Sequence, residues 1–266
     1  MYNKSAESDM RPKTPFVPDG TAALRSLSLE DVVFVNVEGV PELSESSNLT
    51  PELQKYWDEF SAPVRGENVS ASEAYLSAGT VAEFGKTVCI TAGVIRHRDD
   101  DDQPYFITTS YAGDDEREVL TGFASMLNNF FSDRSNVHYL CGHSIWQKDI
   151  PFLAKRLLIN GIELPSLFDP KGRRPLRAQL IDTAEFWTFS DHNAPRVPAN
   201  LLASVFGLDA EAADFDPAEA YRLFYEDGDL DLIKERSERK ALLFAQLMLR
   251  FRGEGVIDQA NVVRKG

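Results

Sequence analysis

The feature that most constrains the fold is a run of four apolar residues, VVFV at positions 32–35, followed at once by polar side chains. A short run rich in β-branched residues is typical of a strand buried on both faces. Asn36 and Glu38 come next, and side chains two apart on a strand point to the same face. Ligand sites in α/β sheets favour the carboxyl ends of strands. Because a buried carboxylate is costly unless it is paired, Glu38 is either a site residue with a partner or an ordinary strand-ending residue.

The rest of the chain shows both strand and helix patterns. Further strands are predicted at residues 82–95, 105–113, 137–141 and 180–183, and helices at residues 49–60, 115–132, 150–159, 199–206, 217–225 and 229–251. This order predicts an α/β fold with a mixed sheet flanked by helices. We expect one folded domain over residues 28–253, an N-terminal tail at 1–27 and a C-terminal tail at 254–266. The charged segment 96–103 is expected to be a solvated hairpin turn, since it lacks the spaced ligands and glycine of a calcium loop.

Composition limits the classes of function. No apolar run approaches the roughly 18 residues that cross a bilayer, and the polar N-terminus lacks the apolar segment of a secretory signal. We therefore expect a cytoplasmic protein with no membrane partner. Cys89 and Cys141 lie in apolar stretches and are expected to be buried thiols. The net charge of −14 argues against tight, general binding of nucleic acid, but it leaves room for a local basic groove.

Single polar residues each have a structural as well as a functional interpretation. Asp149 precedes an Ile-Pro helix start, where an aspartate commonly caps the free amides. His143, taken alone, is interpreted as a hydrogen-bonded structural histidine. The densest basic segment, KGRRPLR at residues 171–177, is either a solvated loop or a phosphate contact.

Longer blocks carry a more specific signal than single residues. They are VVFVNVEGVPE, AEFGKTVCITAGVI, YLCGHSIWQKDIPFLAKRLLINGIELP, LIDTAEFWTF and YEDGDLDLIKERSERKALLFAQLMLRF. With these blocks, over about residues 31–252, the chain resembles the predicted 3′–5′ exonuclease family related to the exonuclease domain of family B DNA polymerases. That family belongs to the DEDD group of the RNase H-like superfamily. The resemblance implies an RNase H-like mixed sheet flanked by helices, and a cleft where four carboxylates hold two metal ions that activate a water.

The same resemblance implies that the active site of this chain is degenerate. The family carries Asp-x-Glu on its first strand, Gly-His-Asn leading to Phe-Asp, and Tyr-x-x-x-Asp on its last long helix. Glu38 and Asp149 match two of the four carboxylates. Asn36 stands where the first aspartate is expected, Lys240 where the last is expected, and Arg236 where the tyrosine is expected.

Other family positions are partly kept. Ser144 and Lys148 replace the asparagine and the phenylalanine of the middle motif. Asp182 matches the family but is not one of the four carboxylates.

Charge counting argues against ordinary two-metal hydrolysis. Glu38 and Asp149 against Lys240 leave about one net negative charge, where an intact site offers about four. Two Mg²⁺ ions about 4 Å apart would repel each other with little to offset the repulsion. Lys240 comes seven residues after Ile233 and four before Phe244, on the apolar side of its helix, so it needs a carboxylate partner. We predict that Glu38, Asp149 and Lys240 converge.

Three functional hypotheses follow. In the first, the chain is an inactive 3′–5′ exonuclease-like pseudoenzyme that uses no cofactor and binds the 3′ end of single-stranded nucleic acid or a protein partner. In the second, it is an active 3′–5′ exonuclease with Mg²⁺ or Mn²⁺ on Glu38, Asp149 and a displaced acid such as Asp182 or Glu238. In the third, it is a protein-interaction module with an empty cleft. The residues expected to contact nucleic acid are His143, Arg173, Arg174 and Arg177.

Overall fold

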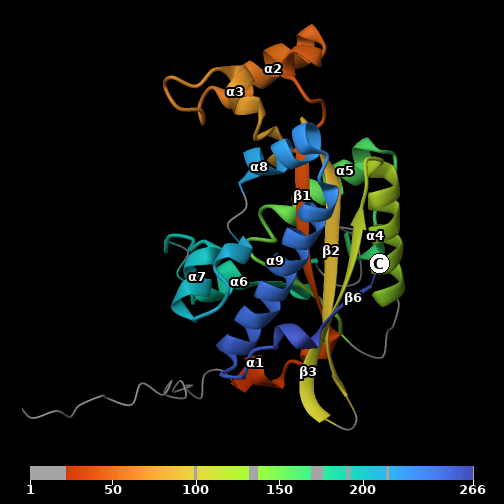
Figure 1. Ribbon diagram of the computed structural model, residues 1–266, viewed down its shortest axis with the longest axis vertical. Coiled ribbons are helices and arrows are strands. Elements are labelled where there is room, and N and C mark those ends of the chain that lie inside the picture. The colour runs from red at the N-terminus through yellow and green to blue at the C-terminus, as the bar shows by residue number, and fades with distance from the viewer. Residues whose placement is uncertain are drawn as a thin grey trace, which may run out of the picture.

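A six-stranded mixed sheet forms the centre of the protein (Figure 1). The computed structural model describes residues 22–98, 101–131, 137–168, 176–189, 191, 193–213 and 216–265. The strands are β1 (Val32–Pro41), β2 (Gly85–Arg98), β3 (Asp101–Ala112), β4 (Tyr139–Gly142), β5 (Leu180–Asp182) and β6 (Val262–Lys265), in the order β5-β4-β1-β2-β3-β6. β2 is antiparallel to β1 and β3, whereas the other neighbouring strands are parallel. The α/β class and the mixed sheet predicted from the sequence are confirmed.

Helices cover both faces of the sheet. One face carries α9 (Leu230–Phe251), with α6 (Thr183–Trp187) and α7 (Ala199–Val205) beside it, and the other carries α4 (Glu116–Phe130) and α5 (Asp149–Ile159). The shorter helices are α1 (Ala22–Ser26), α2 (Pro51–Ser61), α3 (Ala71–Tyr75) and α8 (Pro217–Tyr221), which continues into a π-helical turn, η8 (Arg222–Asp227). The sheet is therefore the middle of three layers.

The two faces divide the side chains of β1 between two cores. Its even-numbered apolar residues at positions 32 and 34 pack with α9, and the odd-numbered ones at 33 and 35 pack with α4 and α5. Because alternate side chains of a strand point to opposite faces, the next even-numbered residues, Asn36 and Glu38, face α9. A β-bulge between Glu38 and Gly39 interrupts the register with β2 just after these two residues.

Residues 42–84 form a helical segment that connects β1 to β2 and stands beyond the end of the sheet, at the top of Figure 1. Besides α2 and α3 it contains the 3₁₀ turns η3 (Ser46–Asn48) and η4 (Ala78–Thr80). Its small core consists of Leu49, Trp57, Tyr75, Ala78 and Phe84. Thr50 caps α2 and Pro51 occupies the first turn, as predicted. At the base of the segment a Cβ on Gly79 would lie 2.4 Å from the Gly39 carbonyl oxygen, so this close backbone contact requires glycine.

Three boundaries differ from the sequence prediction. β2 ends at Arg98 and β3 begins at Asp101, so most of the segment expected to be a turn is strand, with residues 99–100 outside the described ones. α1 lies within the predicted N-terminal tail, whose residues 1–21 are not among those described. The predicted C-terminal tail contains β6, which pairs with β3 and so satisfies backbone groups along its edge.

The apolar character of the core extends to its cysteines. Cys89 and Cys141 are buried free thiols, as predicted. Burial raises the pKa of Cys89 to about 12 and raises that of Cys141 well above its usual value.

Among the residues described, none of the helices combines the length and the apolar composition that a membrane span requires.

Candidate functional site

A hydrogen-bonded polar cluster lies between β1 and α9. The Lys240 ammonium donates to Glu38 Oε1 over 2.9 Å and forms an ion pair with it, across 202 positions of sequence. The Asn36 amide donates to the same Glu38 oxygen over 2.8 Å and to the Ser237 hydroxyl over 3.0 Å. The predicted convergence of Lys240 on Glu38 is therefore confirmed.

The packing of α9 explains why Lys240 points inward. Ile233, Ser237 and Ala241 recur four residues apart and are fully buried against the sheet. Lys240 follows Ser237 by three residues, so it lies beside this stripe. Its side chain is 14% exposed and that of Glu38 is 9% exposed. The pair is thus largely removed from water, where losing either partner leaves a poorly solvated charge.

Asp149 adds a second carboxyl group. It is the first residue of α5, and Lys148 holds the capping position without a side-chain cap bond, so the capping role considered for Asp149 is not found. Asp149 as a whole is half-buried, but its carboxyl group is enclosed by protein. Burial and then repulsion from Glu38 raise the pKa of Asp149 to about 7, while attraction to Lys240 opposes the shift. The carboxyl group is within electrostatic reach of both Glu38 and Lys240.

His143 and Asp182 hold the local structure around the cluster. His143 Nδ1 lies 2.9 Å from Thr183 Oγ1, and Nε2 lies 2.9 Å from the Val197 carbonyl oxygen. Burial lowers the pKa of His143. Asp182 caps α6 and accepts hydrogen bonds from the backbone amides of residues 144, 146, 184 and 185. Both ring nitrogens of His143 and both carboxylate oxygens of Asp182 are therefore engaged within the chain.

Two other charged residues of α9 are directed to different partners. Arg236, at the family's tyrosine position, forms an ion pair with Glu219 of α8. Glu238, which was considered as a displaced metal ligand, is 4% exposed. It accepts hydrogen bonds from the Ser110 hydroxyl over 2.9 Å and from Arg264 Nε over 2.8 Å. Neither contact belongs to the Glu38 cluster.

Ser237 and Arg264 are two of the residues in these networks that sequence reasoning missed; Ser110, Thr183 and Glu219 were not anticipated either. Ser237 lies on the predicted apolar stripe of α9, and a polar residue within such a stripe was the available signal. Arg264 fell in the predicted tail, where no pattern pointed to a buried partner.

The residues present do not fit a pair of divalent cations. One Glu38 oxygen is already bound by the Lys240 ammonium and the Asn36 amide. Asn36 offers a neutral carbonyl at most. Within the described part of the chain, no three His, Cys, Asp or Glu side chains are grouped so that they could hold a metal ion.

The predicted nucleic-acid contacts fall mostly outside the described residues. Residues 169–175, which include Arg173 and Arg174, are not described, and neither is the Arg177 side chain. Only His143 among these four can be placed, in the contacts given above.

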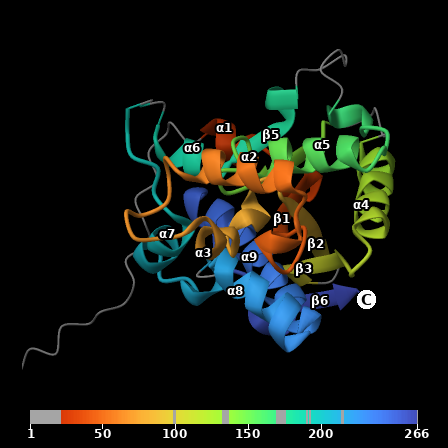
Figure 2. The ribbon, with the colours of Figure 1, turned by 90° about the horizontal axis from the view of Figure 1, so that it is seen from above.

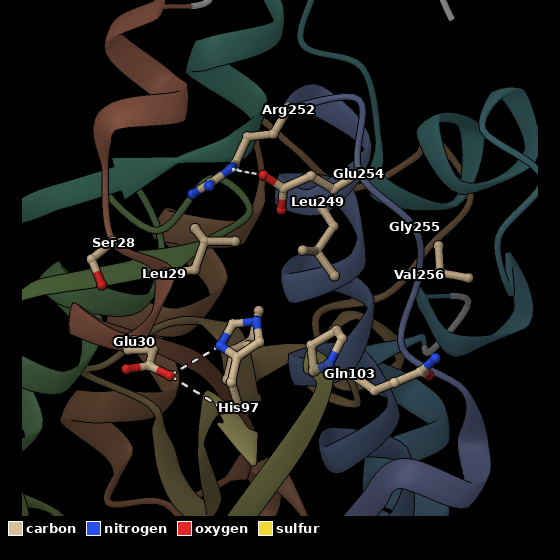
Figure 3. A pocket seen from close by; sticks show the side chains of 12 residues that line it. Ser28, Leu29, Glu30, His97, Gln103, Leu249, Arg252, Glu254, Gly255 and Val256 are labelled. Carbon is tan, nitrogen blue, oxygen red and sulfur yellow. Dashed lines mark hydrogen bonds and ion pairs between the residues drawn. The ribbon is translucent and has the colours of Figure 1, made fainter. Parts of the chain in front are cut away.

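A pocket of about 760 Å³ lies at the opposite end of β1 from Glu38 (Figure 3). Glu30 and His97 face each other across one side of it, 3.0 Å apart, and Arg252 is paired with Glu254 on another. The polar groups of these four side chains are thus paired with one another.

A second pocket, of about 580 Å³, lies over the buried Arg156. This guanidinium is ion-paired with Glu116 and Glu42 and joins α5 to α4 and the end of β1. The contacts are those of a structural network that connects neighbouring elements, and none of the cluster residues lines either pocket.

Comparison with known proteins assigns no family. The chain matches no protein-family model, and no curated protein matches it at a significant level.

Proposed function

We propose that this chain is a catalytically inactive RNase H-like domain of the 3′–5′ exonuclease type, which binds a partner without cutting it. The observation that carries the proposal is the buried ion pair of Lys240 with Glu38, at 2.9 Å. In an enzyme of this type the Glu38 carboxylate would bind metal. Here an ammonium supplies the positive charge, and two further cations would have to be held against its repulsion.

The architecture supports the proposal in a coarser way. A mixed sheet with helices on both faces is the arrangement that the resemblance implies. The first strand lies inside the sheet, its two polar residues face the last long helix, and the helix start after β4 contributes Asp149. The contact of Lys240 with Glu38 and the electrostatic interaction of Asp149 with both support the proposal that these three blocks formed one catalytic site.

The alternative is an active, metal-dependent 3′–5′ exonuclease with an atypical site built on Glu38 and Asp149. It needs a further acid, yet Asp182 and Glu238 are both engaged in other hydrogen bonds. It also needs the Glu38 oxygen that the Lys240 ammonium and the Asn36 amide already bind. The geometry favours the inactive domain.

The net charge of the chain favours a protein partner over nucleic acid. A net charge of −14 opposes the phosphate backbone of nucleic acid, whose binding is driven by counterion release at a basic face. A protein partner meets no such barrier and is the better supported class. Any binding of a single-stranded 3′ end depends on the basic segment 171–177.

A nuclease assay tests the proposal. End-labelled single-stranded DNA and RNA are incubated with the protein in Mg²⁺ and in Mn²⁺, next to Glu38→Gln as the matched control. We expect no shortening from the 3′ end above the level of the control, and calorimetry should detect no pair of bound divalent ions. Metal-dependent shortening by the wild type that Glu38→Gln abolishes would mean that the chain is an active enzyme.

A second variant tests whether these positions can form a metal site when the family residues are restored. Combining Asn36→Asp, Arg236→Tyr and Lys240→Asp rebuilds the carboxylate and tyrosine pattern of the family. We expect this variant to bind Mn²⁺ more tightly than the wild type does, since two acids are added and two cations are removed. Equal Mn²⁺ binding by both proteins would show that these positions do not form a metal site at all.

A further inference from the structure

The apolar side of α2 is wider than the core that covers it. Trp57 is buried in the core of segment 42–84, whereas Leu53, Tyr56 and Phe60 are 39%, 52% and 53% exposed. These three are spaced by three and four residues, so they lie along one side of the helix. Val64, just past the end of α2, is 82% exposed. The stripe belongs to the segment at the top of Figure 1, and Figure 2 shows α2 from above.

A packed aromatic core lies behind this stripe. The Trp57 indole donates to the Ala71 carbonyl oxygen over 2.7 Å, and Phe60 stacks on Trp57 with ring centroids 6.2 Å apart. A capping box between Ser70 and Glu73 begins α3. The exposed side chains at 53 and 56 are not part of this core, so an apolar helix face is presented on a packed base.

The surface around the stripe is strongly acidic. Residues 42–84 contain eight acidic and two basic side chains, a formal charge of −6. Lys55 pairs with Glu59 and Arg65 with Asp58, so both positive charges are matched within the segment. Those of its acids that form no ion pair with a described residue are Glu45, Glu52, Glu67 and Glu73.

We propose that this face of α2, with Leu53, Tyr56 and Phe60, docks an amphipathic helix of another protein whose polar side is rich in lysine and arginine. An apolar helix stripe favours a helix with anchors at matching spacing, and the acidic surround selects a basic one. A second copy of this chain would bring the same negative charge to the interface. Nucleic acid would be repelled for the same reason. The inference goes beyond the proposed function and does not depend on the state of the Glu38 cluster.

Fluorescence anisotropy with designed peptides tests the docking surface. The probe is a labelled helix of about five turns, with leucine on one side and lysine on the other. One control peptide carries glutamate in place of lysine, and another has the lysine probe's composition in scrambled order. The protein variants are Leu53→Ala with Tyr56→Ala, Glu52→Gln with Glu59→Gln, and Leu201→Ala on α7 as a matched exposed leucine elsewhere, 51% exposed.

We expect the lysine probe to bind at micromolar Kd and both control peptides to bind far more weakly. The Leu53 and Tyr56 double variant should weaken binding about ten-fold. The Glu52 and Glu59 double variant should reduce the salt dependence, and Leu201→Ala should leave binding unchanged. Because all the substituted side chains are exposed, melting curves should stay close to wild type.

Four outcomes would overturn the docking surface. The first is no binding of the lysine probe, and the second is a glutamate or scrambled peptide that binds as tightly as the lysine probe. The third is that both α2 variants bind the lysine probe as tightly as the wild type does. The fourth is self-association of the protein that Tyr56→Ala abolishes. Oligonucleotide binding that is lost in the Leu53 and Tyr56 variant would assign the face to nucleic acid instead, which also contradicts the inference. None of these results bears on the nuclease assay, so the two proposals fail separately.

Discussion

At the scale of single residues, Lys240 determines the chemistry of the cluster. Its ammonium occupies the polar space between β1 and α9, where it neutralises Glu38 and lowers the cost of burying that carboxylate. Asn36, bridging Glu38 and Ser237, adds hydrogen bonds without charge. The chain itself therefore supplies the counter-charge of Glu38.

Replacing Lys240 tests this account directly. Lys240→Ala should lower the free energy of unfolding by about 3–5 kcal/mol, because it leaves Glu38 buried without a cation. Lys240→Asp should cost more, and Mn²⁺ should restore part of the loss, since the ion binds only the folded state. Melting temperatures with and without Mn²⁺ measure both effects, with Lys234→Asp on the same helix as the control. If Lys240→Asp melts like wild type and ignores metal, the ion pair has no role.

Asp149 predicts a pH dependence of stability. Its pKa is about 7 in the folded protein, above the ordinary value of an unfolded aspartate, so the folded state holds the proton over a pH range where the unfolded state has lost it. Stability contributed by the protonated form is present at about pH 4 and is lost as the pH rises toward 7. The loss amounts to at most about 4 kcal/mol.

The comparison with Asp149→Asn isolates this contribution from other titrating groups. We expect the variant to gain stability relative to wild type between about pH 4 and 7, and the difference to level off above that range. Urea titrations across this pH range measure it. A difference that does not change with pH would mean that the Asp149 carboxyl group is solvated.

At the scale of elements, α9 connects two separate polar networks. One of its faces reaches Glu38 through Lys240, and Glu238 reaches Arg264 on the edge strand β6. The edge strand therefore contributes more than backbone pairing. It places a guanidinium beside a carboxylate that is otherwise enclosed by α9 and β3.

Removing Arg264 should therefore destabilise the protein. The Glu238 side chain is buried and would lose its charged donor, so we expect Arg264→Ala to cost about 1–3 kcal/mol. Adding Glu238→Gln should recover part of the loss because no charge is then buried. Denaturant unfolding measures the change, and Lys265→Ala on the same strand is the control. Equal stability of Arg264→Ala and Lys265→Ala would show that Glu238 needs no cation.

At the scale of the whole molecule, negative charge dominates. The formal charge is −14, and segment 42–84 carries −6 of it. A charge of this size repels polyanions over distances near the Debye length, which is about 8 Å at physiological salt. Basic proteins are attracted under the same conditions.

Binding of single-stranded nucleic acid should consequently be weak and confined to the basic segment. With oligo(dT), Arg173→Ala together with Arg174→Ala should reduce the affinity. It should also make the negative slope of log K against log salt shallower by about 1.4, because two phosphate contacts of about 0.7 each are lost. Lys55→Ala, within the acidic segment, is the control. An unchanged salt slope in the Arg173 and Arg174 variant would exclude this segment as the contact.

Several features of the protein follow from local sequence alone. The β-branched run at 32–35 predicts a strand buried on both faces, and the alternation of a strand then puts Asn36 and Glu38 on one side. The stripe of α9 has a period near 3.6 residues, so its phase predicts that Lys240 points inward. The α/β class follows from the order of these elements. These inferences depend on periodicity within elements and on the order of the elements along the chain, both of which a sequence displays directly.

The partners of the charged side chains were decided only by the tertiary structure. Asp149 faces the cluster because α5 begins at this residue; a helix that began one residue later would make Asp149 its cap. The pairing of Arg236 with Glu219 depends on where α8 packs. The contact of Glu238 with Arg264 requires that the last strand join the sheet beside β3. Such contacts join residues far apart in the chain. They are set by which faces bury the most apolar surface together, and no local pattern records that.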